Sequence, residues 1–163
     1  GSPQQLPMEM FKHLAGVEIL HVPFKGDSET LSNILGGQVT MSFASATSVL
    51  PNIKAGNLKA LAVGGNRRIV VLPNVPTMAE SGYPAFEWHN WFGFMAPAGT
   101  PKAIIAKLNR EMIAFLALPA IKQEFQEAGY VMAAGSPEDF SALIRKDTAR
   151  YGELIGKLGI APD

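Results

Sequence analysis

The feature that most constrains the fold of this chain is the alternation of short apolar segments with amphipathic ones along its first half. Residues 17–22, 38–43 and 58–63 have the length and composition of β-strands. Between them, residues 27–35 and 45–55 show the apolar spacing of helices, and each is followed by glycine. Two successive strand–helix–strand passages predict parallel pairing with right-handed crossovers. We therefore expect an α/β fold class.

The second half of the chain is expected to be more helical. Glycines and prolines between residues 64 and 84 indicate a long connection. An aromatic strand is predicted over residues 86–96, and a helix from Pro101 follows it with Thr100 as the N-cap. Two further helices are predicted to begin near Pro119 and after Ser136.

Composition narrows the classes of function. The 163 residues include 14 basic and 14 acidic side chains, so the formal net charge is zero. A nucleic-acid-binding surface needs an excess of Lys and Arg, so nucleic acid is not an expected partner. The absence of cysteine excludes disulfides, cysteine-ligated zinc and thiol catalysis. There is no run of about 18 apolar residues, so no segment is predicted to span a membrane.

Sequence motifs give no direct sign of catalysis. The chain contains no phosphate-binding loop, dinucleotide-binding fingerprint, zinc-protease motif or nucleophile elbow. Its histidines, His13, His21 and His89, do not lie at metal-ligand spacing. We therefore expect no enzyme, no metal and no cofactor. A small hydrolase-like α/β enzyme whose active site leaves no motif is the alternative, and a fragment that binds only another protein is the third reading.

Two segments place hydrogen-bond donors where a small anion can bind. Gly1 and Ser2 precede the first predicted helix, and free backbone N–H groups at a helix start attract carboxylates. Ordinary capping by Ser2 explains the same pattern. Phe24, Lys25 and Gly26 follow the first predicted strand, and ligands of open α/β sheets gather outside the carboxyl ends of strands. A turn with a solvated lysine is the alternative there.

A third candidate segment lies at the end of the second predicted strand. Phe43, Ala44 and Ser45 lead into a helix, where a hydroxyl group and backbone amides can bind an anion. Simple capping by Ser45 is again the alternative. The aromatic residues Trp88 and Trp91 are a different case, because such side chains are expected to pack in the core rather than to hold a ligand.

Several longer runs occur in an order that is more specific than any single motif. They are MFKHLAGV from residue 10, HVPFKG from 21, LGGQV from 35, IKAGNLKALAV from 53, LPNVPT from 72, ESG from 80, WFG from 91 and APAGTP from 96. In this order they resemble the solute-binding receptors of tripartite tricarboxylate transporters, the Bug or TctC-like family. The resemblance extends over nearly the whole chain.

The resemblance implies a periplasmic-binding-protein type II-like fold, in which two α/β lobes close on a ligand. It implies a periplasmic receptor that captures a small carboxylate and delivers it to membrane transporter subunits without catalysis. It also implies a partial chain that lacks the family's N-terminal portion. Residues 1–84 are then most of the second lobe, and residues 85–163 are the crossing strand and the C-terminal helical part of the first lobe. The apolar surfaces that this leaves exposed are expected to allow a homodimer.

The resemblance also suggests roles for the candidate residues. Gly1 and Ser2 match the helix start that holds the ligand carboxylate, and residues 24–26 match an aromatic–Lys–Gly loop that lines the cleft. Phe43 and Ala44 fall where many relatives have Phe-Asp. Because Ala44 has no carboxylate to pair with an ammonium group, we hypothesise a preference for plain mono- or dicarboxylates over amino acids.

Overall fold

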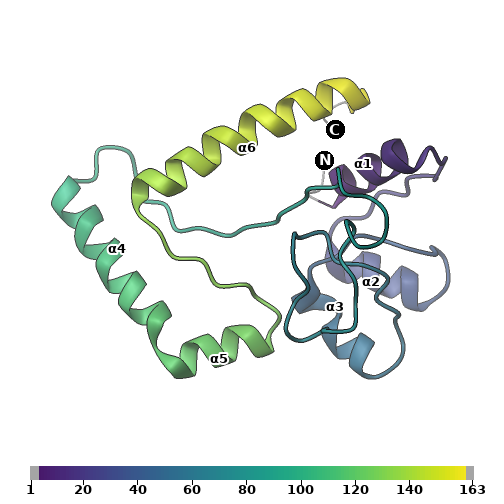
Figure 1. Cartoon of the computed structure of the whole chain (residues 1–163), viewed down its shortest axis with the longest axis horizontal. Helices are drawn as coiled ribbons and strands as arrows, with labels where there is room; N and C mark the ends of the chain where they lie inside the picture. Colours follow the sequence, from purple (N-terminus) through teal and green to yellow (C-terminus); the bar gives the residue numbers. More distant parts are fainter. Residues whose placement is uncertain (1–3, 161–163) are drawn as a thin grey trace.

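The computed structural model describes residues 4–160 of the chain (Figure 1). Its helices are α1 (Gln5–Ala15), α2 (Asp27–Leu35), α3 (Ala46–Lys54), α4 (Lys102–Ala117), α5 (Pro119–Glu127) and α6 (Pro137–Leu158). The sequence predicted each of these helices, with small differences at their ends.

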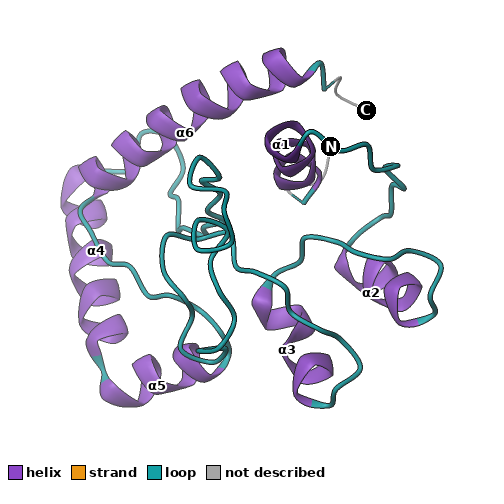
Figure 2. Ribbon diagram, turned by 45° about the vertical axis from the view of Figure 1, so that its right-hand side comes forward, coloured by secondary structure: helices purple, strands orange, loops and turns teal. Residues whose placement is uncertain are grey.

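The helices form two groups that are joined by an extended crossing segment, residues 86–96 (Figures 1 and 2). Helices α1, α2 and α3 lie on one side with the connection 64–84, and α4, α5 and α6 form an open frame on the other. Within the groups, α2 packs against α3 and α4 packs against α5. Between the groups, α1 packs against α6. The contact of α1 with α6 ties the two groups together. The assignment of residues 1–84 and 85–163 to two lobes stays a prediction.

The helix ends follow local chemistry. Helix α6 begins with a capping box, in which the Asp139 N–H donates to Ser136 Oγ and the Ser136 N–H donates to an Asp139 carboxylate oxygen, each over 3.0 Å. Hydrogen bonds from the Ser136 hydroxyl and N–H hold the pKa of Asp139 below its ordinary value. Helix α1 ends at Gly16, whose φ of 64° suits glycine. The predicted cap of α4 is wrong, because Pro101 occupies the N-cap position and the Thr100 hydroxyl closes the preceding turn.

The predicted strands do not form ladders. Residues 4–160 contain no β-strand (Figure 2), and a single parallel bridge joins Val63 to Thr77. A strand requires regular backbone hydrogen bonds to a neighbour in register. In residues 4–160 no such ladder forms along the four predicted segments, 17–22, 38–43, 58–63 and 86–96, although Val63 donates to Pro76 and accepts from Met78, and Trp88 donates to the Gly64 carbonyl. Their apolar side chains are correspondingly uncovered: Leu20 is 87% and Leu61 is 61% exposed.

A small core fixes the start of the crossing segment. Met10 of α1, Met78 of the connection and Phe86 of the crossing segment pack together and are 4–6% exposed. The ring of Phe86 also stacks on Phe43, with 5.5 Å between the ring centroids. Burial of a side chain of this size contributes about 1.5–3 kcal/mol. Three segments far apart in sequence are thereby held at one point.

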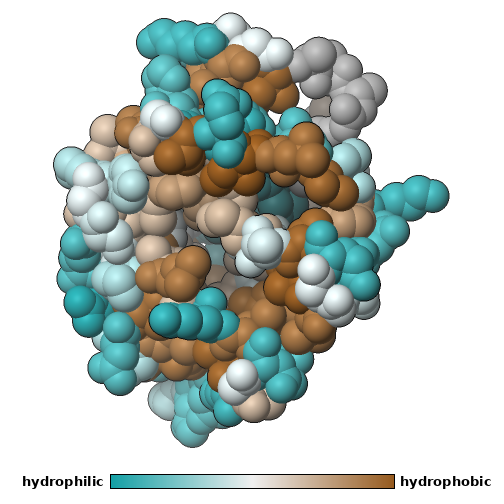
Figure 3. All heavy atoms as spheres, turned by 90° about the vertical axis from the view of Figure 1, so that its right-hand side faces the viewer, coloured by the Kyte–Doolittle hydropathy of each residue, from teal (hydrophilic) through white to brown (hydrophobic). Residues whose placement is uncertain are grey.

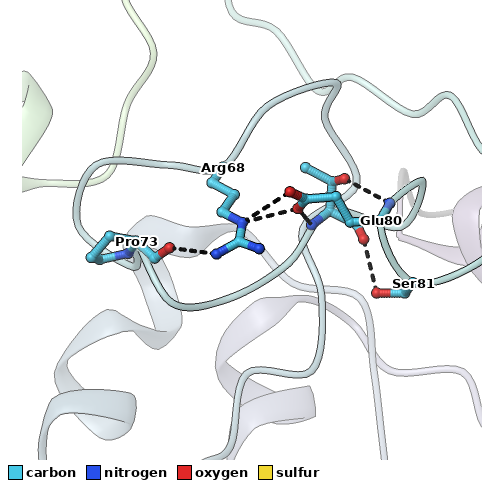
Figure 4. A network of polar contacts seen from close by, with 5 residues as sticks. Arg68, Pro73, Glu80 and Ser81 are labelled. Atoms are coloured by element: carbon cyan, nitrogen blue, oxygen red, sulfur yellow. Dashed lines mark hydrogen bonds and ion pairs between the residues drawn. The ribbon is translucent and has the colours of Figure 1, made fainter.

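Arg68 braces the connection between residues 64 and 84 (Figure 4). Its guanidinium group donates to the Glu80 carboxylate over 3.0 and 3.2 Å and to the Pro73 carbonyl over 3.0 Å. Glu80 also accepts the Thr77 N–H over 2.7 Å, while Thr77 Oγ1 accepts the Glu80 N–H over 3.1 Å. The hydrogen bonds from Arg68 first, and from Thr77 second, hold the pKa of Glu80 below its ordinary value. This network fixes Thr77 beside its bridge partner Val63.

The Glu80→Gln substitution tests this brace through its pH dependence. A depressed folded-state pKa contributes stability that is present above the unfolded value of about 4.3 and is lost as the pH falls through the folded pKa. We expect the variant to be less stable than the wild type at about pH 7 and the difference to shrink below about pH 4. Urea midpoints across this range measure it. Glu111→Gln is the control, because its ion pair with Arg110 lies in solvent, and a pH-independent loss in the Glu80 variant would contradict the account.

Candidate functional site

The helix starts in the first group differ from the start of α6. Among residues 4–160, no side chain caps the first turn of α1, α2 or α3, whereas Ser136 and Asp139 cap α6. The first N–H groups of a helix have no partner within it, and the helix dipole favours an anion beside them. Helix α2 carries Asp27 and Glu29 in its first turn, while α1 and α3 carry no acidic residue there. Within the first group, the starts of α1 and α3 therefore suit a carboxylate better than that of α2; the starts of α4 and α5 also lack a side-chain cap and an acidic residue in the first turn.

The starts of α1 and α2 lie side by side. Gln4 Nε2 donates to Asp27 Oδ1 over 2.9 Å, although the two residues are 23 positions apart. This bond brings the loop at residues 24–26 to the start of α1, as a shared site would require. Gly1 and Ser2, which were predicted to hold the carboxylate, lie outside the residues that the structure describes. Their role stays a prediction.

The loop before α2 has a conformation that depends on glycine. Gly26 is the N-cap of α2 with φ 154° and ψ 179°, a region that other residues rarely adopt. The backbone N–H of Lys25 donates to a Glu29 carboxylate oxygen over 2.8 Å, while the Lys25 side chain is exposed to solvent. Phe24 is half-buried. The loop thus presents a cation beside two helix starts, which is consistent with its predicted role and does not test it.

The third candidate segment is divided between the core and the surface. The ring of Phe43 stacks on Phe86, so this side chain packs against the core cluster. Ala44 is exposed, and Ser45 is the N-cap of α3 without a hydrogen bond from its side chain to the helix. Simple capping by the Ser45 hydroxyl, the alternative reading, is therefore not what the structure contains. A Cβ atom built on Gly129 would lie 3.4 Å from the Cβ of Ala46, so the end of α5 closely approaches the start of α3.

Within residues 4–160, no group of three His, Asp or Glu side chains lies close enough together to hold a metal ion. No helix in that range is both long and apolar enough to cross a bilayer.

A hollow between the crossing segment and α6 was missed by sequence reasoning. It has a volume of about 550 Å³ and is lined by both tryptophans. Trp91 Nε1 donates to Asp147 Oδ2 over 2.7 Å, and Asp147 is 8% exposed. Trp88 packs on Tyr151 with 5.1 Å between the ring centroids. Both tryptophans thus pack against α6 and are half-buried. The sequence contains one signal of this arrangement: Asp147 falls within the apolar stripe of α6, at helical spacing from Ile144 and Tyr151.

Comparison with solved structures defines the class of protein. The R. palustris protein Rpa4515 with adipate matches 100% of this chain at a TM-score of 0.92 with 35% identity, and the match covers 55% of that chain. The periplasmic binding protein BugD matches 98% at a TM-score of 0.85 with 33% identity, over 54% of its chain. MatC from Rhodopseudomonas palustris with bound malate matches 93% at a TM-score of 0.78 with 27% identity, over 53% of its chain. The predicted fold class, a partial periplasmic-binding-protein α/β fold, is confirmed.

Sequence comparison defines the family. The family model for the tripartite tricarboxylate transporter family receptor, TctC, matches residues 1–160, so this chain belongs to that family. BugT from Bordetella pertussis is 35% identical over 159 residues, which are 98% of this chain and 49% of BugT. The UPF0065 protein in the tcbD–tcbE intergenic region of Pseudomonas sp. strain P51 is 37% identical over 95% of this chain and 46% of its own length. The chain spans about half the length of these relatives.

Replacement of Trp91 by Phe tests the bond that joins the crossing segment to α6. The variant keeps an aromatic ring but leaves the buried Asp147 carboxylate without its donor. Because a buried acceptor that loses its partner costs about 1–3 kcal/mol, we expect a loss of that size in urea unfolding followed by circular dichroism. Trp88→Phe is the matched control, since Trp88 packs through its ring on Tyr151. Equal losses in the two variants would show that the Trp91 hydrogen bond contributes nothing.

Proposed function

We propose that this chain is part of an extracytoplasmic solute-binding receptor that captures a small carboxylate and delivers it to a membrane transporter. The observation that carries the proposal is the pair of helix starts, those of α1 and α3, without a side-chain cap among residues 4–160, with the loop that carries Lys25 beside the start of α1, in a chain of the TctC receptor family. The similar protein Rpa4515 is described with adipate, and MatC with malate. BugD is described as a periplasmic binding protein, which supports a periplasmic location for this one.

The donors of the proposed site are backbone amides. At the start of α1 they are the N–H groups of Gln5 and Leu6, because Pro7 has none. At the start of α3 they are those of Ala46 and Thr47, since the Ser48 N–H already donates to the Ser45 carbonyl over 3.1 Å. Amides held in a helix need no reorganisation to bind an anion, and charge-assisted bonds of this kind are among the stronger ones. Lys25 adds a positive charge at the edge.

Ala44 is the proposed determinant of ligand class. It is exposed immediately before the start of α3 and offers no carboxylate to an ammonium group. An amino acid would therefore bring a positive charge that finds no partner at this position, whereas a plain dicarboxylate brings none. We infer a preference for mono- or dicarboxylates.

Binding without turnover is part of the same proposal. The solved structures that resemble this chain are described as binding proteins or a transporter, which supports a receptor over the hydrolase-like alternative. Transporter subunits are the proposed macromolecular partners. A homodimer through the exposed apolar surfaces is a separate hypothesis.

Titration with adipate and malate tests the proposed function, and titration with aspartate and glutamate tests the proposed preference for plain carboxylates over amino acids. Because the chain spans about half of its relatives, we expect dissociation constants for the two dicarboxylates in the millimolar range, about −4 kcal/mol, by calorimetry. The amino acids should bind at least about tenfold more weakly, and Ala44→Asp should reduce that difference. Tight binding of aspartate or glutamate to the wild type, with no response to adipate or malate, would refute the assigned ligand class.

A further inference from the structure

We propose that the hollow between the crossing segment and α6 binds a small organic cation, namely a primary ammonium group on an apolar body. We call this site the tryptophan hollow, and Trp88, Trp91 and Asp147 are among the residues that line it. Its lining comes from the crossing segment and α6, and includes neither of the helix starts at α1 and α3. The inference goes beyond carboxylate capture, because it concerns another part of the chain and a ligand of the opposite charge.

The tryptophan hollow contains a buried carboxylate without a cationic partner. Asp147 is 8% exposed, and the donor to its Oδ2 is the neutral indole N–H of Trp91, over 2.7 Å. Within residues 4–160, no basic side chain forms an ion pair with Asp147. Its other oxygen, Oδ1, accepts no hydrogen bond in that range and keeps some accessible surface. Because buried acidic side chains are otherwise almost always paired, a cation in the hollow would complete this site.

Arg150, which lies one turn further along α6, is engaged elsewhere. Its guanidinium group pairs with the Glu87 carboxylate over 3.1 Å, also donates to the Glu87 carbonyl, and lies 5.5 Å from the centroid of the Tyr151 ring. The described residues that line the hollow include no Lys or Arg. With His89 neutral, Asp147 therefore gives the lining a negative charge, which suits a cation and disfavours an anion.

The aromatic walls of the hollow are held in place by their own packing. Trp91 packs edge-on against Phe140, with 5.1 Å between the ring centroids and 86° between the planes. Trp88 packs on Tyr151, also at 5.1 Å. Indole rings attract cations more strongly than the other aromatic side chains do. Because the two rings are already fixed, little side-chain entropy is lost when a ligand binds between the crossing segment and α6.

The size and lining of the hollow define the class of cation. Its volume of about 550 Å³ lies within the range of about 300–1,000 Å³ that small-molecule sites have. Ile144 and Ile155 add apolar surface to that of the tryptophans. The Asp147 carboxylate accepts N–H donors, which a primary ammonium group supplies and a quaternary one lacks. The ligand class is therefore a primary amine with an apolar or aromatic body.

Apolar surface elsewhere on the chain makes charge the decisive property of a probe. The space-filling view shows apolar side chains gathered around a hollow on the face that it presents (Figure 3). Phe92 and Phe94, on the crossing segment, are 77% and 83% exposed. Since exposed apolar surface binds apolar molecules of any charge, the test compares probes that share one apolar body and differ in charge.

Tryptophan fluorescence is the readout, because the chain contains two tryptophans and both line the hollow. The full chain is titrated at about pH 7 with phenethylamine, whose amino group is protonated there as that of a lysine is. Phenethyl alcohol is the neutral probe and hydrocinnamate the anionic one. We expect a saturable change with the amine and an affinity at least about tenfold higher than for either of the other probes.

Asp147→Asn is the decisive variant, because its side-chain oxygen can still accept the Trp91 N–H while the charge is removed. We expect the affinity for phenethylamine to fall at least about tenfold, to that for the alcohol. Glu153→Gln is the matched control on the same helix. Its side chain is 68% exposed and pairs with Lys157 in solvent, so the affinity should change less than about twofold. Circular dichroism shows whether each variant retains its helices.

Equal affinities for the three probes, or no response to phenethylamine, would overturn the proposal. So would an affinity for the amine that is unchanged in a folded Asp147→Asn variant. The comparison of the three probes uses the wild-type chain, so it decides the question even if that variant does not fold. Neither adipate nor malate enters this titration, and failure here is therefore distinguishable from failure of the proposed function.

Discussion

The structure depends on the anchoring of the crossing segment at its start and at its middle. Phe86 is fixed in the core with Met10 and Met78, and five residues later Trp91 donates its indole N–H to the buried Asp147. Trp88, which lies between these anchors, also faces α6. Because successive side chains of a regular extended chain point to opposite sides, Trp88 and Trp91 can both face the helix only if this alternation is interrupted between them. The two groups of helices also meet where α1 packs against α6 and where Gly129 closely approaches Ala46. Together with these contacts, the anchors determine how the helix starts of the first group are placed relative to α4, α5 and α6.

The proposed binding site follows from what the helix starts lack. In α6 the Ser136 and Asp139 side chains satisfy the first turn, and that start has no need of an external anion. Within residues 4–160, the first turns of α1 and α3 have no side-chain cap and carry no acidic side chain, whereas Asp27 and Glu29 already complement α2. An anion that binds there replaces a missing cap.

The helices were predictable from sequence because their signals are local, and the strands were not because strands depend on partners. The run from Ser136 to Asp139 contains its own hydrogen-bond donors and acceptors, and Gly16 supplies its own left-handed turn. A segment such as 58–63 becomes a strand only beside another backbone in register, which residues 4–160 do not provide. For the site, the loop at Gly26 and the N-cap position of Ser45 were foreseeable from spacing. The Gln4–Asp27 bond, the stacking of Phe43 on Phe86 and the burial of Asp147 were not, because each joins residues far apart in sequence.

Amide chemical shifts under titration with adipate test the central claim most directly, and the molecule provides its own control. The account predicts that the N–H signals of Gln5, Leu6, Ala46 and Thr47 move together and saturate with one dissociation constant. The signals of Glu138 and Asp139, at the capped start of α6, should stay in place. Shifts that avoid the starts of α1 and α3, or that are equally large at the start of α6, would contradict the account.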